Sequence, residues 1–367
     1  MEKKKYASLF DKLFTCGLLV ALFTISQIMV ASGAASRKFS GLLVNICVYV
    51  ILAMSLNLVV GISGELSLGH AGFMCIGAYT GSVFSIVMQN TLTNPLVRFP
   101  LAILVGGVIA AVFGFLIGIP VLRLRGDYLA IVTLAFGEII KSVATNIYLA
   151  YDKNGVFITL SNQAITEYKT TSDAATRVEL IKGAQGISGT PQDSGFVLCF
   201  IVVLITVIVL LNLVDSKLGR NIKAARDNRI AAEAMGVNVT RTKMIAFVIA
   251  SFFAGVAGVL YSHNLSILQA KTFDYNLSIL ILVYVVLGGM NKMRGVMIAT
   301  LILYVLPEYL RFLRDFRMLL YAIVLIVMML LNNNAKFKLL VATVSGKVKS
   351  LFVKPSKKAK ITEGGQH

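Results

Sequence analysis

The sequence predicts an all-α fold: a polytopic transmembrane helical bundle of about ten spans, with the N-terminus and C-terminus cytoplasmic. Of the 367 residues, 57% are hydrophobic and 14% are charged, and the mean hydropathy is +0.81. An average soluble domain has roughly 25% charged residues. Apolar runs of about 20 residues, the length that crosses a bilayer as a helix, recur from Phe14 almost to the end. These observations predict one membrane domain over 1–332 and a basic cytoplasmic tail over 333–367.

The first apolar run, 14–35, has two interpretations. It follows Lys3, Lys4 and Lys5 and ends in small residues, which is also typical of a cleavable signal peptide. Its length favours a retained helix. The ninth run is short and five glycines interrupt the third, so the count is approximate. The remaining spans are expected at 41–60, 66–88, 99–122, 128–150, 195–214, 244–262, 275–290, 295–307 and 317–332.

Charge asymmetry sets the orientation of these spans. With both termini inside, about 23 of the 35 Lys and Arg residues lie on the inner side and about 11 on the outer side. The opposite orientation would violate the positive-inside rule. The formal net charge of +18 is therefore explained mostly by topology. No basic module with interleaved aromatic residues is present, so nucleic-acid binding is not expected.

The sequence predicts neither an enzyme nor a metal protein. Cys16, Cys47, Cys75 and Cys199 lie in apolar runs without CxxC spacing, as small buried hydrophobes do. His70 and His263 lack metal-ligand spacing with carboxylates or cysteines, so structural histidines are expected. No Ser-His-Asp order or carboxylate pair indicates catalysis. We therefore expect no catalytic residue, no metal and no cofactor bound by this chain.

Two polar segments are longer than simple connections between helices. The outer one, 151–194, carries mixed charge and ends in a glycine-containing string before Pro191. The inner one, 215–243, is rich in Lys and Arg. Loops beyond about 12 to 15 residues are usually functional or disordered. Both segments are therefore candidates for a role in function.

The inner segment contains the pattern of a short capped helix. Asp227 or Asn228 can serve as its N-cap, and Gly236 stands where a C-terminal glycine is expected. Small side chains between them would let another protein surface approach closely. The segment thus predicts a compact basic knob on the cytoplasmic side.

Polar residues within the spans are candidates for a solute pathway. Glu138 and Lys141 lie near the middle of the fifth span, at an i,i+3 spacing that allows an ion pair. Charges within the membrane usually face a cavity or the interior of a bundle. Lining the pathway and tying helices together are both consistent with the sequence.

A second candidate lies at the start of the third span. Gly64, Glu65, His70 and neighbouring glycines predict an interrupted helix, whose free backbone groups could bind a zwitterion. Close helix packing is the alternative use of such glycines, and it is favoured. Asn57 lies shortly before the break and is a weaker candidate.

Several strings in order along 41–332 resemble the branched-chain amino acid permease family of ABC importers, and the long outer segment resembles the larger of its two permease types. The chain departs from the family at Met290-Asn291, where a small residue or glycine is usual, and in the tail from Lys336. The matching strings are Ser55-Leu-Asn-Leu-Val-Val-Gly-Ile-Ser-Gly-Glu-Leu-Ser-Leu-Gly-His-Ala-Gly-Phe73, Gly126-Asp-Tyr-Leu-Ala-Ile-Val-Thr-Leu-Ala-Phe-Gly-Glu-Ile-Ile140, Gly186-Ile-Ser-Gly189, the EAA-type string Ala231-Ala-Glu-Ala-Met-Gly236, Phe253-Ala-Gly-Val-Ala-Gly-Val-Leu-Tyr261 and Gly288-Gly289.

The resemblance implies a permease subunit that imports leucine, isoleucine and valine across a bacterial inner membrane. It also implies a second homologous permease subunit, two ATP-binding subunits and a soluble substrate-binding protein as partners, with lipid around the spans. The residues that it implies contact an ATP-binding subunit are Asp227, Ala231, Ala232, Glu233, Ala234 and Gly236. No G-x-x-x-x-G-K-[ST] loop occurs in this chain, so ATP is expected on the partner subunits. A urea or short-amide permease and an ion-driven secondary transporter are the alternatives.

Overall fold

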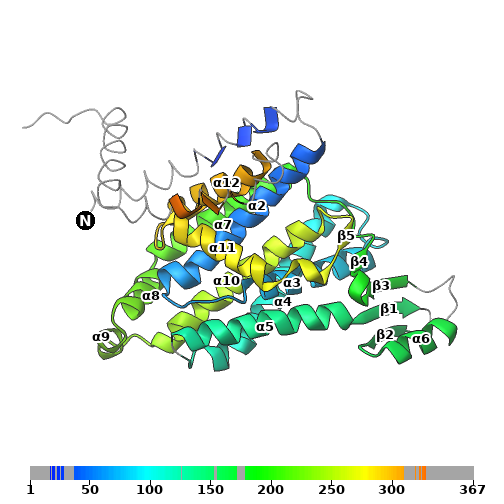
Figure 1. Ribbon diagram of the computed structural model, residues 1–367, viewed down its shortest axis with the longest axis horizontal. Coiled ribbons are helices and arrows are strands. Elements are labelled where there is room, and N and C mark those ends of the chain that lie inside the picture. Colours follow the sequence, from blue (N-terminus) through cyan, green and yellow to red (C-terminus); the bar gives the residue numbers. More distant parts are fainter. Residues whose placement is uncertain are drawn as a thin grey trace, which may run out of the picture. The chain divides into compact units, whose positions relative to one another are not determined.

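The computed structural model describes residues 37–309 apart from 125, 153–154 and 172–177, with a few residues between 17 and 28 and between 319 and 327 (Figure 1). Contacts divide the chain into two units, Met1–Glu308 and Tyr309–His367. The described residues of the second unit are helical. The expected spans at 14–35 and 317–332 and the tail at 333–367 lie wholly or mostly outside the described residues.

Seven helices in the described part are long and apolar enough to cross a membrane, so the chain is a multi-pass membrane protein. An eighth helix, α12, covers the expected ninth span, but its 17 residues make it slightly shorter than the other seven spans, the last of which runs over Ala270–Gly288. These helices are α2 (Arg37–Asn57), which continues into a π-helix (Leu58–Ile62), α3 (His70–Val87), α4 (Pro95–Val121), α5 (Asp127–Asn146), α7 (Phe196–Asp215), α10 (Val239–Ser262), α11 (Tyr275–Gly288) and α12 (Met293–Tyr309).

The helices α2, α3 and α10 form the centre of the first unit, where most of their residues are buried. Small residues allow α3 and α10 to touch: a Cβ added to Gly77 would lie 2.3 Å from the Cα of Gly255. The prediction that Gly72, Gly77 and Gly81 interrupt the third span is wrong. They lie inside the continuous helix α3. Glycine at these positions lets neighbouring helices pack closely, which is common at helix interfaces in membranes.

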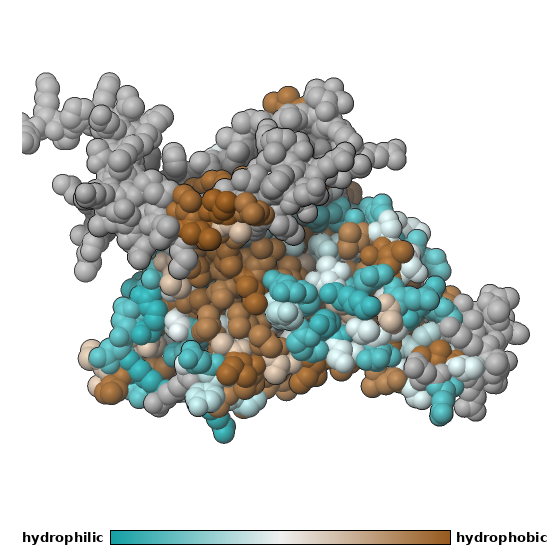
Figure 2. All heavy atoms as spheres, viewed as in Figure 1, coloured by the Kyte–Doolittle hydropathy of each residue, from teal (hydrophilic) through white to brown (hydrophobic). Residues whose placement is uncertain are grey.

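The helices α4, α5 and α7 surround this centre and bury only about a third of their residues within the chain. Their outward side chains are apolar, among them Leu104, Ile131 and Ile205. Figure 2 shows apolar surface over α11 and α12 and hydrophilic surface over α8 at one end. Such faces suit lipid or another apolar helix, not water.

The outer segment is folded, so the description all-α is incomplete. The fifth span ends at Asn146, not at 150, because Tyr148 begins a strand. An antiparallel sheet of order β2-β1-β3 precedes the pair β4-β5. The elements are β1 (Tyr148–Asp152), β2 (Gly155–Thr159), α6 (Asn162–Thr171), β3 (Val178–Lys182), a 3₁₀ turn (Gly183–Gln185), β4 (Ile187–Ser188), β5 (Ile267–Leu268) and a second 3₁₀ turn (Ala270–Thr272).

The inner segment contains two helices where the sequence predicted one. They are α8 (Lys217–Asp227) and α9 (Arg229–Ala234), and they follow α7 directly. In Figure 1 they lie at one end of the first unit, and β1, β2 and β3 lie at the other. The inner and outer segments therefore lie at opposite ends of the spans, as the charge asymmetry requires.

Candidate coupling loop and helix break

The short helix α9 forms as its sequence predicts. Asn228, not Asp227, is its N-cap: the Asn228 side chain accepts a hydrogen bond from the backbone N–H of Ala231 at 3.0 Å. Gly236 follows the helix with φ +80°, a left-handed conformation that favours glycine. Arg229 and Glu233 form an i,i+4 ion pair at 2.9 Å on its surface. Local rules therefore account for both ends of the helix.

The two ends of α9 expose large apolar side chains. Ile230 is 81% exposed and Met235 is 84% exposed, whereas Ala232 is buried against Ala225 and Val239. Ala231, Glu233, Ala234 and Gly236 are exposed as well. Burying Ile230 and Met235 against a partner protein would remove apolar surface from water, so this basic loop is a candidate docking surface.

The predicted break lies between Ile62 and His70. The π-helix ends at Ile62, residues 63–69 have irregular backbone, and α3 begins at His70. Gly64 has φ +76° in this segment. The N–H of Leu68 donates to Thr133 Oγ1 of α5 at 3.0 Å. We call residues 63–69 the break; π-helical turns next to such a segment are frequent at functional sites.

The structure joins the break to the inner segment, which sequence reasoning missed. Glu65 forms an ion pair with Lys243, in the first turns of α10. Arg226, at the end of α8, donates to the Gly61 carbonyl at 3.0 Å and to the side chain of Asn291. Asn291 has φ +76° and is the only non-glycine residue with positive φ in the described part of the chain. The departure from the family at this position thus keeps a conformation that glycine favours.

Several buried oxygens near the break have no hydrogen-bond partner among the described residues. They are Oδ1 of Asn57 and the hydroxyls of Ser63 and Ser67. The Nδ2 of Asn57 contacts Met293 Sδ at 3.3 Å. Leaving a buried polar group unpaired costs about 1–3 kcal/mol. This region therefore has unused capacity to bind a polar group.

The remaining candidates within the spans have partners. The Lys141 ammonium lies 2.5 Å from Glu138 Oε2, which confirms the predicted local ion pair. Glu138 Oε1 also accepts the backbone N–H of Tyr275, so it joins α5 to α11. His70 is buried with its Nε2 2.8 Å from Ser55 Oγ. Among the described residues, no three His, Cys, Asp or Glu side chains form a metal-ligand group.

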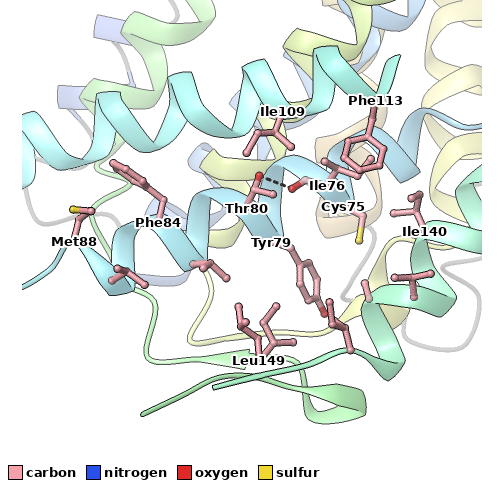
Figure 3. A pocket seen from close by; sticks show the side chains of 16 residues that line it. Cys75, Ile76, Tyr79, Thr80, Phe84, Met88, Ile109, Phe113, Ile140 and Leu149 are labelled. Carbon is pink, nitrogen blue, oxygen red and sulfur yellow. Dashed lines mark hydrogen bonds between the residues drawn. The ribbon is translucent and has the colours of Figure 1, made fainter. Parts of the chain in front are cut away.

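A cavity of about 540 Å³ lies between α3, α4, α5 and the outer sheet (Figure 3). Its wall has two hydroxyls, both from α3: Thr80 Oγ1 bonds back to the Ile76 carbonyl at 2.7 Å, and the buried Tyr79 hydroxyl has no hydrogen-bond partner among the described residues. The lining is almost entirely apolar and includes Tyr79, Phe84, Ile109, Phe113, Ile140 and Leu149. The cavity can accept an aliphatic group but offers little to orient a charged one.

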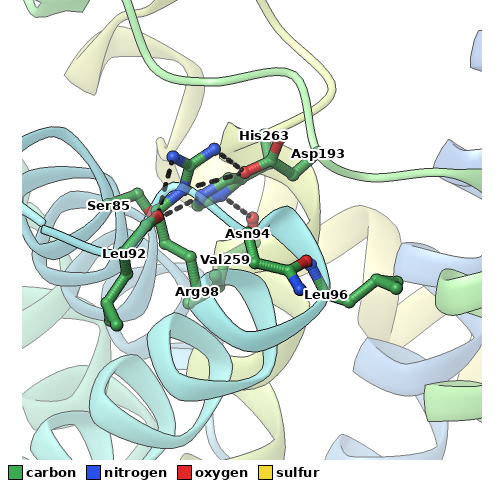
Figure 4. Close-up of polar contacts among 8 residues, drawn as sticks. All are labelled: Ser85, Leu92, Asn94, Leu96, Arg98, Asp193, Val259 and His263. Atoms are coloured by element: carbon green, nitrogen blue, oxygen red, sulfur yellow. Dashed lines mark hydrogen bonds and ion pairs between the residues drawn. The ribbon is translucent and has the colours of Figure 1, made fainter. Parts of the chain in front are cut away.

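A buried polar cluster lies where the outer segment meets α3, α4 and α10 (Figure 4). Arg98 Nη2 lies 2.6 Å from Asp193 Oδ2, which ties the end of the outer segment to α4. His263 Nδ1 donates to the Val259 carbonyl at 2.9 Å, so Nε2 accepts from the Ser85 hydroxyl at 2.7 Å. Burial lowers the pKa of His263 to about 4. The expectation of a structural histidine at this position is consistent with these contacts.

The family of branched-chain amino acid transport system permease components matches residues 39–331. The high-affinity branched-chain amino acid transport system permease protein LivM of Salmonella typhimurium is 34% identical over 324 residues, 87% of this chain and 73% of its own. LivM of Escherichia coli is also 34% identical, over 325 residues, with the same coverage.

A more distant relative is the probable branched-chain amino acid transport permease protein LivM of Methanocaldococcus jannaschii. It is 25% identical over 286 residues, 69% of this chain and 75% of its own. No solved structure matches the chain. The family match covers most of the chain, including the break and the inner segment, and it agrees with the resemblance read from the sequence. The chain belongs to the family of branched-chain amino acid transport system permease components.

Proposed function

We propose that this chain is the permease subunit of an ATP-driven importer of leucine, isoleucine and valine in a bacterial inner membrane. A second homologous permease would complete the pathway, two ATP-binding subunits would bind inside, and a soluble binding protein would deliver solute outside. The observation that carries the proposal is α9, a capped helix with exposed Ile230 and Met235 at the inner end of the spans. A rigid projecting helix suits the transfer of movement from an ATPase to a membrane domain.

The solute pathway is assigned to the side of the bundle that contains the break. Asn57, Ser63 and Ser67 supply buried oxygens without partners, which a polar solute or its water could satisfy in another conformation of the importer. His70 and the pair Glu138–Lys141 stay candidates for the same pathway. Glu65 is tied to Lys243, so it is not assigned to the pathway.

Reconstitution tests this proposal directly. The chain would be placed in proteoliposomes with its permease and ATPase partners, binding protein outside and ATP within. We expect uptake of labelled leucine that requires ATP and is reduced by isoleucine and valine but not by urea. Uptake of urea in place of leucine would assign the chain to short-amide transport. Uptake that follows an ion gradient without any ATPase would overturn the importer assignment.

A further inference from the structure

The break is held by residues on both sides of α9. Arg226 precedes this helix in the chain and Lys243 follows it, and both reach the break or its border. We propose that Lys243 and Arg226 are the positioning residues that carry movement of α9 to the break, with the Lys243–Glu65 ion pair as the main connection. This inference rests on the proposed function, because it requires an ATPase that moves α9.

The ion pair is suited to transmit force because it is shielded from water. The Lys243 side chain is 17% exposed and the Glu65 side chain is 13% exposed. An ion pair in such surroundings is strong once formed, and leaving one member alone is costly. The pair links residues 178 apart in sequence. When the start of α10 moves with α9, Glu65 must therefore follow Lys243.

The second connection is made by Arg226. Its guanidinium satisfies the Gly61 carbonyl, which lies in the last turn of the π-helix, where helix carbonyls lose their internal partners. A Cβ on Gly64 would lie 2.6 Å from Arg226 Cγ, so the arginine stem packs where Gly64 has no side chain. Arg226 also bonds to Asn291 in the turn between α11 and α12. Movement of α8 is thus applied to the start of the break and to the turn between α11 and α12.

The break is a segment that can respond to this movement. Its backbone has no regular ladder of hydrogen bonds, and two of its serines have buried hydroxyls without partners among the described residues. Segments with few internal hydrogen bonds change conformation at low free energy. The break ends at His70, the first residue of α3, and α3 packs against α10 and α4. A displaced Glu65 would therefore shift the start of a central helix.

A purely structural ion pair is the rival explanation, and two balanced variants separate the two. The neutral pair, Glu65→Gln with Lys243→Met, leaves no buried charge alone but breaks the connection. The swapped pair, Glu65→Lys with Lys243→Glu, keeps the connection with reversed charge. A structural role predicts that the neutral pair works as well as wild type. The matched control neutralises an outer pair in the same way, Glu179→Gln with Lys182→Met, whose charged atoms lie 3.9 Å apart on β3.

The measurement is leucine uptake per ATP hydrolysed in the reconstituted complex. We expect the neutral pair to keep its membrane abundance, ATPase recovery and basal hydrolysis while uptake per ATP falls about tenfold. The swapped pair and the conservative pair, Glu65→Asp with Lys243→Arg, should restore most of the coupling, and the outer control should match wild type. Wild-type coupling in the neutral pair, or equal losses in the neutral and swapped pairs, would overturn the inference.

A second measurement does not depend on recovery of the neutral pair. A spin label at Leu66→Cys, a partly exposed position in the break, should change its mobility when ATP binds to the otherwise wild-type complex. An unchanged label in a complex that transports leucine would also overturn the inference. Failure of wild type to recruit an ATPase or to use ATP would instead refute the proposed function, before any variant is compared.

Discussion

The backbones of Gly77 and Gly255 touch: a methyl group on Gly77 would lie 2.3 Å from the Cα of Gly255. The neighbouring atoms belong to main chain, which cannot move aside as the end of a flexible side chain can. The contact joins α3, which begins where the break ends, to α10, which follows α9 in the chain. The contact therefore ties together the two helices through which the inner segment is proposed to act on the membrane domain.

The first prediction concerns this contact. Gly77→Ala should destabilise the protein by about 1–3 kcal/mol, because the added methyl group forces α3 away from α10. Thermal unfolding in detergent, followed by size-exclusion chromatography, would measure the loss. Gly41→Ala is the control: it lies in α2 with no heavy atom within 4 Å of the new methyl group. It should be neutral or stabilising by up to about 1 kcal/mol, and equal losses would contradict the packing argument.

The second prediction concerns the end of α9. A Cβ on Gly236 meets no atom within 4 Å, so Gly236→Val acts only through strain at φ +80°. We expect normal membrane abundance, weaker recovery of the ATPases on pull-down and less substrate-stimulated ATP hydrolysis. Glu233→Arg, which reverses the charge on the exposed face of α9, should do the same.

Gly189→Val is the matched control for the strain. Gly189 has φ +84° and equally open surroundings, but it lies in the outer segment. The substitution should leave ATPase recovery unchanged. If both glycine variants lose ATPase recovery to the same degree, general destabilisation and not α9 is responsible.

Some of this site follows from local rules and some does not. Asn228 and Gly236 were predictable because a helix cap depends on neighbours a few residues away. The break at Gly64 was predictable for the same reason, but its limits were not, because whether Gly77 bends a helix or packs against Gly255 depends on a partner far along the chain. The Lys243–Glu65 pair and the contacts of Arg226 with Gly61 lay beyond sequence reasoning for this reason.

The outer sheet was missed for a different cause. Residues from 151 onward are polar enough to suggest a loop, and β1 pairs with β3, from which β2 and α6 separate it in the chain. The alternation in Val156-Phe157-Ile158 was available as a sign of a strand: Val156 and Ile158 are exposed and Phe157 stacks on Tyr168. In the inner segment, the prediction did not include α8, although Ser216 caps it and its buried residues Gly219, Ile222 and Ala225 recur at an i,i+3 spacing.

The third prediction concerns Glu138 and Lys141. Removing either charge leaves the other without its partner, so Glu138→Gln or Lys141→Met should yield less folded protein than the double variant. The side chains are 34% and 25% exposed, which limits the expected difference to about 1 kcal/mol. The amide oxygen introduced by Glu138→Gln can still accept the Tyr275 N–H, so the comparison isolates the charge. Equal amounts of monodisperse protein from all three variants would indicate independent, solvated side chains.

The fourth prediction concerns acid stability. The pKa of His263 is about 4 in the folded protein because burial disfavours the charged ring, with Asp193 opposing and Arg98 assisting, against about 6.5 when unfolded. Below pH 6.5 the unfolded state binds the proton more readily, so stability falls as pH falls towards 4. His263→Gln should remove this contribution to the pH dependence of the free energy of unfolding, which is about 1.4 kcal/mol per pH unit. The prediction would be contradicted if the melting temperatures of wild type and His263→Gln fell by the same amount between pH 7 and pH 5.

The fifth prediction concerns topology. An impermeant thiol reagent applied to intact cells should label Ile158→Cys in the outer sheet and not Met235→Cys at the tip of α9. Both positions are exposed, and Cys47, Cys75 and Cys199 are buried and need no replacement. Cys16 lies outside the described residues and would be changed to serine in both variants. In inverted membrane vesicles the pattern should reverse, and labelling of Met235→Cys in intact cells would refute the orientation.

Because β1 pairs with β3, the chain does not need to be continuous between these two strands to hold them together. Leu149 pairs with Ile181, and the hydroxyl of Tyr148 donates to Glu179 at 2.7 Å, so the two ends of the intervening stretch are held without the residues between them. The ion pair between Arg98 and Asp193 also joins the part of the chain before this stretch to the part after it. Two fragments divided at Ser161, one ending there and one beginning at Asn162, should therefore assemble in the membrane when produced together. The permease could then be built and studied as two complementing halves, each labelled separately.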